Sequence, residues 1–189
     1  MAFSKAIRAL TVFTVFTTAA ANCYQNQKPM MSSPTPANLR VHIEPATEDS
    51  TLKVTVSNTH ESTPLTILTW DAPFDRLSRD SGTYHIQSTK PGSEELESLG
   101  IKIKRMLPAP RDALVEIPAK GKIERELQLK SKWIPTDGEH YKVWAKGPWR
   151  AVWAKKLDDV TDDDLKSIVG EFDIDSKYET NVAEIVLKE

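Results

Sequence analysis

The residues Asp80-Ser81-Gly82-Thr83 match the loop that carries the catalytic carboxylate of aspartic proteases. That chemistry needs two carboxylates that share one proton and act as an acid–base pair. The chain contains one copy of the motif, so it would have to dimerise to build the pair, and residues 77–79 are not the apolar strand that this loop requires. We therefore interpret the motif as an ordinary turn.

Acidic residues near the C-terminus have side chains of the kind that binds calcium. Five residues fall on positions of the calcium-loop template: Asp173, Asp175, Glu179, Asn181 and Glu184. Lys177 stands where a further ligand belongs, and Tyr178 stands where the loop needs glycine. A second group is interpreted as the solvated start of a helix: Asp158, Asp159, Asp162, Asp163 and Asp164. With one cysteine and four histidines in the chain, we expect neither a metal ion nor a cofactor.

The sequence also lacks the patterns of nucleophilic catalysis and of nucleotide binding. It contains no Gly-x-Ser-x-Gly, and its seven glycines are scattered singly instead of forming a phosphate-binding loop. Its one cysteine, Cys23, precedes the region that we expect to fold, so a catalytic Cys–His pair is not expected. These observations favour a protein that is not an enzyme.

Aromatic residues around position 150 form the candidate binding site of the chain. Trp149 and Trp153 would share one face of a strand, with Arg150 on the opposite face. Exposed indole rings of this kind stack on sugars or anchor protein partners. The alternative is that both rings fill the end of a hydrophobic core, as we expect for Trp70 in its strand.

The composition is that of a folded protein, with 39% hydrophobic residues and a net charge of −2 over 189 residues. A balance so close to neutral gives no reason to expect a nucleic-acid partner. The charge is nevertheless uneven, because residues 101–154 carry 12 basic and 6 acidic side chains whereas residues 155–189 carry 5 basic and 11 acidic ones. Either the two segments pack together, or the basic one faces an acidic partner.

The N-terminus has the features of a secretory signal peptide. Residues 1–21 combine Lys5 and Arg8 with a short apolar stretch and end in three alanines. Alternatives are a mitochondrial presequence and a retained membrane anchor. We predict a signal peptide over 1–21, a flexible Pro/Ser-rich leader over 22–38 and a folded domain over 39–189. The mature protein is then extracellular, without stable insertion in a membrane.

Alternation of apolar and polar residues dominates from residue 39 onward and predicts short strands. The predicted strands are 39–43, 52–56, 65–70, 83–87, 101–104, 113–117, 123–129, 140–146 and 182–187. This spacing is typical of an antiparallel β-sandwich. One helix is predicted over 161–170, with Thr161 as its N-cap, Asp164 in its first turn and Gly170 at its end.

The order of these segments resembles a known module. Its marks are Val54-Thr55-Val56-Ser57-Asn58-Thr59, Leu65 to Asp75 with Trp70 and Pro73, Ile103-Lys104-Arg105 with Pro108, and Asp112 to Gly121. Residues 39–145 thereby resemble the immunoglobulin-like, propeptide-type region that precedes the catalytic domain of deuterolysin-type and peptidyl-Lys metallopeptidases. Residues 146–189 look like the extension of small stand-alone fungal proteins. The resemblance implies an all-β, immunoglobulin-like antiparallel sandwich with one short C-terminal helix.

The peptidase activity does not follow from this resemblance. Its zinc site needs His-Glu-x-x-His, whereas His60-Glu61 is followed by Ser62-Thr63-Pro64 and no second histidine. The sequence therefore predicts a non-enzymatic secreted binding module, in its most concrete form a free-standing propeptide-like chaperone or inhibitor of a secreted peptidase. The alternative is a carbohydrate or cell-wall binding protein, or a secreted effector, that uses exposed tryptophans. A small hydrolase would require a concave site with paired carboxylates.

Overall fold

The computed structural model describes residues 34–168 and 176–188. The predicted signal peptide and residues 22–33 of the predicted leader lie outside this described part. Residues Pro36–Asn38, at the end of the predicted leader, form a 3-10 turn, η1, that leads directly into the first strand. None of the helices within the described ranges is both long and apolar enough to cross a membrane.

Ten strands run through the described residues and pair antiparallel. The first sheet has the order β1 (Leu39–Pro45), β2 (Thr51–Asn58) and β6 (Lys122–Gln128). The second has the order β10 (Ala183–Lys188), β7 (Asp137–Pro148) and β4 (Tyr84–Ser88), and β9 (Lys177–Glu179) pairs with the end of β7. The third has the order β5 (Leu114–Ile117), β3 (Leu65–Leu68) and β8 (Val152–Trp153).

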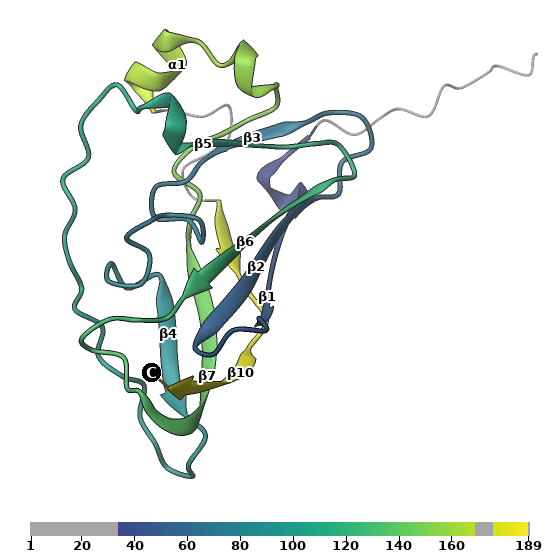
Figure 1. Cartoon of the computed structure of the whole chain (residues 1–189). Helices are drawn as coiled ribbons and strands as arrows, with labels where there is room; N and C mark the ends of the chain where they lie inside the picture. The colour runs from purple at the N-terminus through teal and green to yellow at the C-terminus, as the bar shows by residue number, and fades with distance from the viewer. Residues whose placement is uncertain (1–33, 169–175, 189) are drawn as a thin grey trace, which may run out of the picture. The chain divides into compact units, whose positions relative to one another are not determined.

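The first two sheets form the layers of a β-sandwich (Figure 1). The alternation predicted from the sequence places one face of each strand inside. Val54 and Val56 of β2 are buried in the same cluster as Ile86 of β4, Val143 of β7 and Ile185 of β10. An antiparallel immunoglobulin-like sandwich is therefore confirmed as the architecture.

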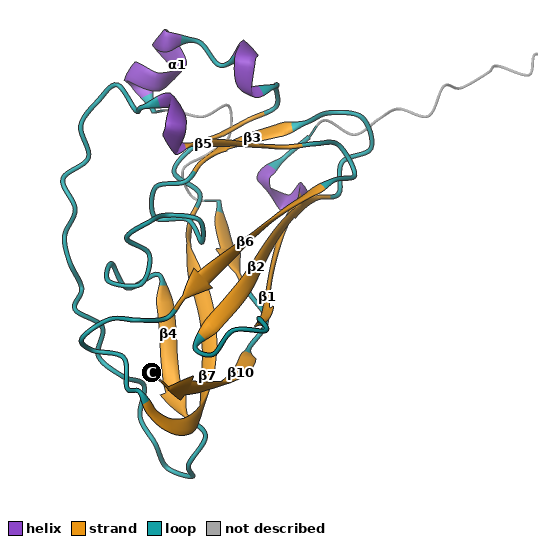
Figure 2. Cartoon of the chain, viewed as in Figure 1, coloured by secondary structure: helices purple, strands orange, loops and turns teal. Residues whose placement is uncertain are grey.

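A second, smaller core lies under the third sheet, at the end where the helical turns gather (Figure 2). It includes Leu68 of β3, Trp153 of β8 and Leu165 of the helix. The turns are η2 (Arg111–Ala113) and η3 (Leu157–Asp159), and the helix is α1 (Asp162–Ser167). The single short helix near the C-terminus is thus confirmed.

The predicted start of α1 is confirmed, but its predicted end is wrong. Thr161 and Asp164 form a reciprocal capping box, in which the Asp164 N–H donates to the Thr161 hydroxyl and the Asp164 carboxylate accepts from the Thr161 N–H. The helix ends at Ser167, because Ile168 takes the left-handed conformation with φ of 42°. Gly170, the expected end, lies outside the described residues.

Eight of the nine predicted strand segments coincide with observed strands, within a few residues. The ninth, 101–104, forms no strand and pairs with none of the described strands. Two short strands were not predicted, β8 and β9, since two or three residues give too little alternation to detect. Trp70, placed at the end of the predicted strand 65–70, lies in the turn beyond β3 and is buried.

Side chains supply backbone-like hydrogen bonds where the sheets would otherwise end. The Asn181 amide accepts from the Ile43 N–H and donates to the Ile43 carbonyl, each at 2.9 Å, and so joins β1 to the segment before β10. The Ser50 hydroxyl donates to the Lys188 carbonyl at 2.6 Å and accepts from the Lys188 N–H at 2.8 Å. Buried backbone groups need such partners, and these two contacts join the two layers at their edges.

Leu165 tests whether α1 is packed as part of the fold. Replacing this side chain, which is 3% exposed, by alanine is expected to lower the free energy of unfolding by about 2–5 kcal/mol through lost burial and the cavity left behind. Leu99→Ala is the matched control, because Leu99 is 52% exposed and its loss should cost less than about 0.5 kcal/mol. Urea unfolding of both variants measures the difference, and equal midpoints would contradict this packing.

Candidate functional site

The two tryptophans of the predicted binding site are core residues. Trp149 is 2% exposed and its ring lies 4.8 Å from that of Tyr178, while Trp153 is 1% exposed in the core under the third sheet. Of the two interpretations that the sequence left open, the structure shows the core one, so these rings do not form an exposed aromatic platform. The sequence did not show that β8 pairs with β3, which places Trp153 inside, or that Trp149 packs against Tyr178.

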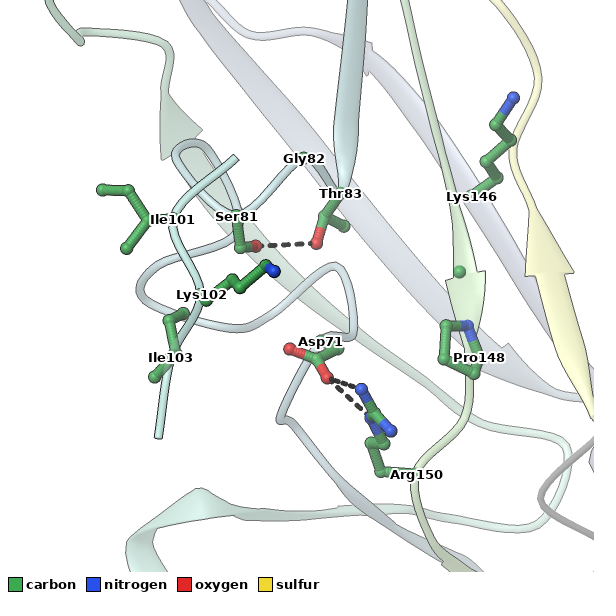
Figure 3. Close-up of a pocket in the computed structure, with 11 residues that line it drawn as sticks. Asp71, Ser81, Gly82, Thr83, Ile101, Lys102, Ile103, Lys146, Pro148 and Arg150 are labelled. Atoms are coloured by element: carbon green, nitrogen blue, oxygen red, sulfur yellow. Dashed lines mark hydrogen bonds and ion pairs between the residues drawn. The ribbon is translucent and has the colours of Figure 1, made fainter. Parts of the chain in front are cut away.

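Arg150, the third predicted site residue, is exposed and faces Asp71 (Figure 3). Its Nε and Nη2 lie 2.6 and 2.5 Å from the Asp71 Oδ2. Asp71 has a φ of 57°, and its carbonyl accepts a 2.9 Å hydrogen bond from the Tyr178 hydroxyl. Glycine at position 147 leaves room for the Tyr178 hydroxyl, because a Cβ there would lie 2.9 Å from its oxygen. Burial raises the pKa of Tyr178, which keeps the hydroxyl a donor.

A cavity of about 390 Å³ lies beside the Arg150–Asp71 pair (Figure 3). Its cationic side chains are Lys102, Lys146 and Arg150, and its apolar walls include Ile101, Ile103 and Pro148. The two hydroxyls that line it, on Ser81 and Thr83, lie 3.2 Å apart and bond to each other. With one carboxylate and no histidine on its wall, this cavity offers a binding surface of positive charge and no acid–base pair.

The buried carboxylate of Asp75 links the turn after β3 to the long connection between β4 and β5. Asp75 is 4% exposed, and it accepts hydrogen bonds from the N–H groups of Asp71 at 2.9 Å and Leu77 at 3.1 Å. Its charge is paired with the guanidinium of Arg105, which also lies 5.3 Å from the centre of the Trp70 ring. This pair fastens the long connection between β4 and β5 to the turn after β3.

Residues 99–107 of that connection lie on the surface with unusually apolar side chains. Leu99, Ile101, Met106 and Leu107 are 52%, 49%, 76% and 53% exposed. The Ile101 N–H donates to the Asp80 carbonyl at 3.0 Å, whereas the backbone groups of residues 102–107 form no hydrogen bond with any described residue. The segment thus begins with the alternating sequence of a strand, and the backbone of residues 102–107 has no hydrogen-bond partner among the described residues. We name residues 99–107 the open segment.

The remaining motifs have structural roles. Asp80 accepts a 2.5 Å hydrogen bond from the Ser131 hydroxyl, and Gly82 has a φ of 85°, so the Asp-Ser-Gly-Thr sequence is the turn that we expected. His60 is buried, and its ring accepts from the N–H groups of Ser62 and Thr63 at 3.3 and 3.1 Å. These contacts belong to a turn and leave the His-Glu pair without the geometry of a zinc site.

The acidic residues near α1 pair with bases within the described part of the chain. Asp162 pairs with Arg111, Asp163 with Lys166, and Asp164 with Lys155. Glu179 and Glu184 lie on the separate strands β9 and β10, whereas Asp173 and Asp175 are outside the described residues. No cluster of three or more potential metal ligands occurs among the residues described.

The Asp75–Arg105 pair makes a stability prediction. Asp75→Ala leaves the half-buried Arg105 without its counterion and two N–H groups without an acceptor, so the free energy of unfolding should fall by about 3 kcal/mol. Asp158→Ala, at an exposed aspartate, is the control and should unfold at the wild-type denaturant concentration. A wild-type midpoint for Asp75→Ala would show that this pair does not hold the connections.

Comparison with known proteins agrees with this architecture. A family model described as immunoglobulin-like domain matches residues 38–187. A protein of Arthroderma benhamiae that bears the name "Uncharacterized secreted protein" is 32% identical over 129 residues. The aligned part covers 67% of this chain and 65% of that relative, so the chain spans a little under two thirds of the relative's length. Since the family model covers most of its length, the chain belongs to the family of immunoglobulin-like domains.

Proposed function

We propose that the chain is a non-enzymatic secreted module that binds another protein along the open segment. The name of the fungal relative supports secretion, and the apolar h-region and basic start of residues 1–21 support it independently. The immunoglobulin-like sandwich provides a rigid scaffold, and function on such scaffolds resides in the loops that it presents. The cavity beside Arg150 extends the surface, since Ile101 and Lys102 line it.

The observation that carries the proposal is the combination of a strand-like sequence with unpaired backbone. A free strand edge binds an extended peptide by adding it as a further strand, in which backbone hydrogen bonds give affinity and alternating side chains give specificity. Exposed apolar side chains are concentrated in this one connection, with four of the six large ones that the described residues expose. If a partner covers these four side chains, their apolar surface is removed from water, where its exposure is unfavourable in the free protein.

Charge indicates what kind of segment fits. Residues 98–111 contain Lys102, Lys104, Arg105 and Arg111 and no acidic residue. Arg105 is neutralised by Asp75, which leaves the two exposed lysines to meet the partner, together with Lys146 across the cavity. An extended segment with acidic and apolar residues in alternation is complementary to this surface.

The propeptide-type resemblance of residues 39–145 points to a secreted metallopeptidase of the deuterolysin type as the partner, with the module acting as its chaperone or inhibitor. The carbohydrate alternative has lost the feature that supported it, because the rings of Trp149 and Trp153 are inside the core. Arg150 is retained as a contact residue of the protein-binding surface, where its pairing with Asp71 fixes its position.

Titration of the purified protein into a deuterolysin-type peptidase, with the peptidase activity followed in the same samples, tests this function. We expect saturable heat and falling activity. Ile101→Asp should weaken binding about tenfold or more, because it places a carboxylate where apolar surface is buried on binding. The control is Val182→Asp, which alters a side chain that is 59% exposed outside the open segment. Absence of heat and of inhibition at micromolar concentrations would remove the peptidase as a partner.

A further inference from the structure

A second cavity, of about 620 Å³, is formed by residues from four different parts of the chain. Trp70, Phe74 and Arg76 come from the turn after β3, and Arg125 comes from β6. Arg105 comes from the connection before β5, and Asp112 comes from the turn η2 at the end of that connection. The only residue that this cavity shares with the open segment is Arg105, so an inference about it goes beyond the proposed protein-binding function.

Two guanidinium groups in this cavity rest on aromatic rings. The Arg105 guanidinium carbon lies 5.3 Å from the centre of the Trp70 ring, and that of Arg125 lies 4.9 Å from the centre of the Phe74 ring. Stacking on an aromatic face restricts a side chain that is otherwise flexible and leaves the N–H groups at its edge free to donate. The cavity therefore presents donors whose positions are fixed before a ligand arrives.

The charges of the cavity do not cancel internally. Arg105 is paired with the buried Asp75, so those two charges offset each other. Arg76 and Arg125 are exposed, and neither guanidinium forms an ion pair or a hydrogen bond with any described residue. Against them stands one further carboxylate on the wall, that of Asp112, so that the lining carries a net charge of +1, from three arginines and two aspartates.

We propose that this cavity binds a carboxylate group attached to an apolar body. A guanidinium fork matches the two coplanar oxygens of a carboxylate, and Arg125 has that fork free. The apolar body would lie against Trp70, Phe74 and Pro110. Asp112 repels a second negative charge, which favours a monoanion over phosphate or a dicarboxylate. Such a group is present both in a small aromatic acid and at the free C-terminus of a polypeptide that ends in an apolar residue.

Titrations followed by NMR chemical shifts on the intact protein test this inference with two acids, their two amides and inorganic phosphate. Phenylacetate represents the small acid, and N-acetylphenylalanine represents the polypeptide terminus. The corresponding amides have the same apolar body without the charge. Both acids should bind and both amides should bind at least about tenfold more weakly, because a hydrogen bond to a charged group contributes that much to affinity. The acid that binds more tightly identifies the source of the carboxylate.

Three variants assign the binding to this cavity. Arg125→Gln should weaken the acids about tenfold, and Arg40→Gln, at an exposed arginine of β1 in the same sheet, should leave them unchanged. Asp112→Asn should tighten binding, a gain that a misfolded variant cannot produce. Equal affinity for acids and amides, inorganic phosphate binding more tightly than either acid, or an Arg125→Gln variant with wild-type affinity would each overturn the proposal.

Discussion

The part of the molecule that carries both candidate surfaces depends on the buried carboxylate of Asp75. Removing a charge from water costs several kcal/mol, and Asp75 offsets that cost with two backbone N–H donors and the Arg105 guanidinium. The N–H of Asp71 is one of those donors, so the turn is shaped around the carboxylate. Asp71 in turn meets Arg150 and the Tyr178 hydroxyl, which fixes the end of β7 and the strand β9 to the same turn.

Both candidate surfaces follow from the position of Arg105. Its side chain points inward to Asp75 and Trp70, which anchors the later part of the long connection to the turn after β3. Ile101 and Lys102 of the open segment line the cavity beside Arg150. The second cavity is lined by Arg105 itself, by the turn after β3 and by Arg125 of β6. Arg105 is thus a positioning residue for both candidate surfaces. Their exposed cations without an ion pair among the described residues are Lys102, Lys104, Lys146, Arg76 and Arg125.

Alternation of residue types was sufficient to predict the strands and the fold class, because a half-buried strand needs an apolar residue at every second position. It could not show whether a strand finds a neighbour, and for this reason 101–104 was predicted as a strand although nothing pairs with it. It also could not show which face of a short segment is inside, and therefore whether Trp149 and Trp153 are buried. Asp75 was not singled out, since burial of one aspartate depends on Arg105, thirty positions along the chain.

The open segment would be a hazard if its sequence were apolar throughout, because free strand edges pair with one another. Two copies aligned edge to edge would bring Lys102 and Lys104 of one molecule close to the same lysines of the other, and like charges oppose that pairing. Pro108 and Pro110 limit its length, since proline supplies no N–H to a ladder. The lysines that oppose self-association in this arrangement are the same ones that would attract the acidic strand of the proposed partner, so one pair of residues could serve both ends.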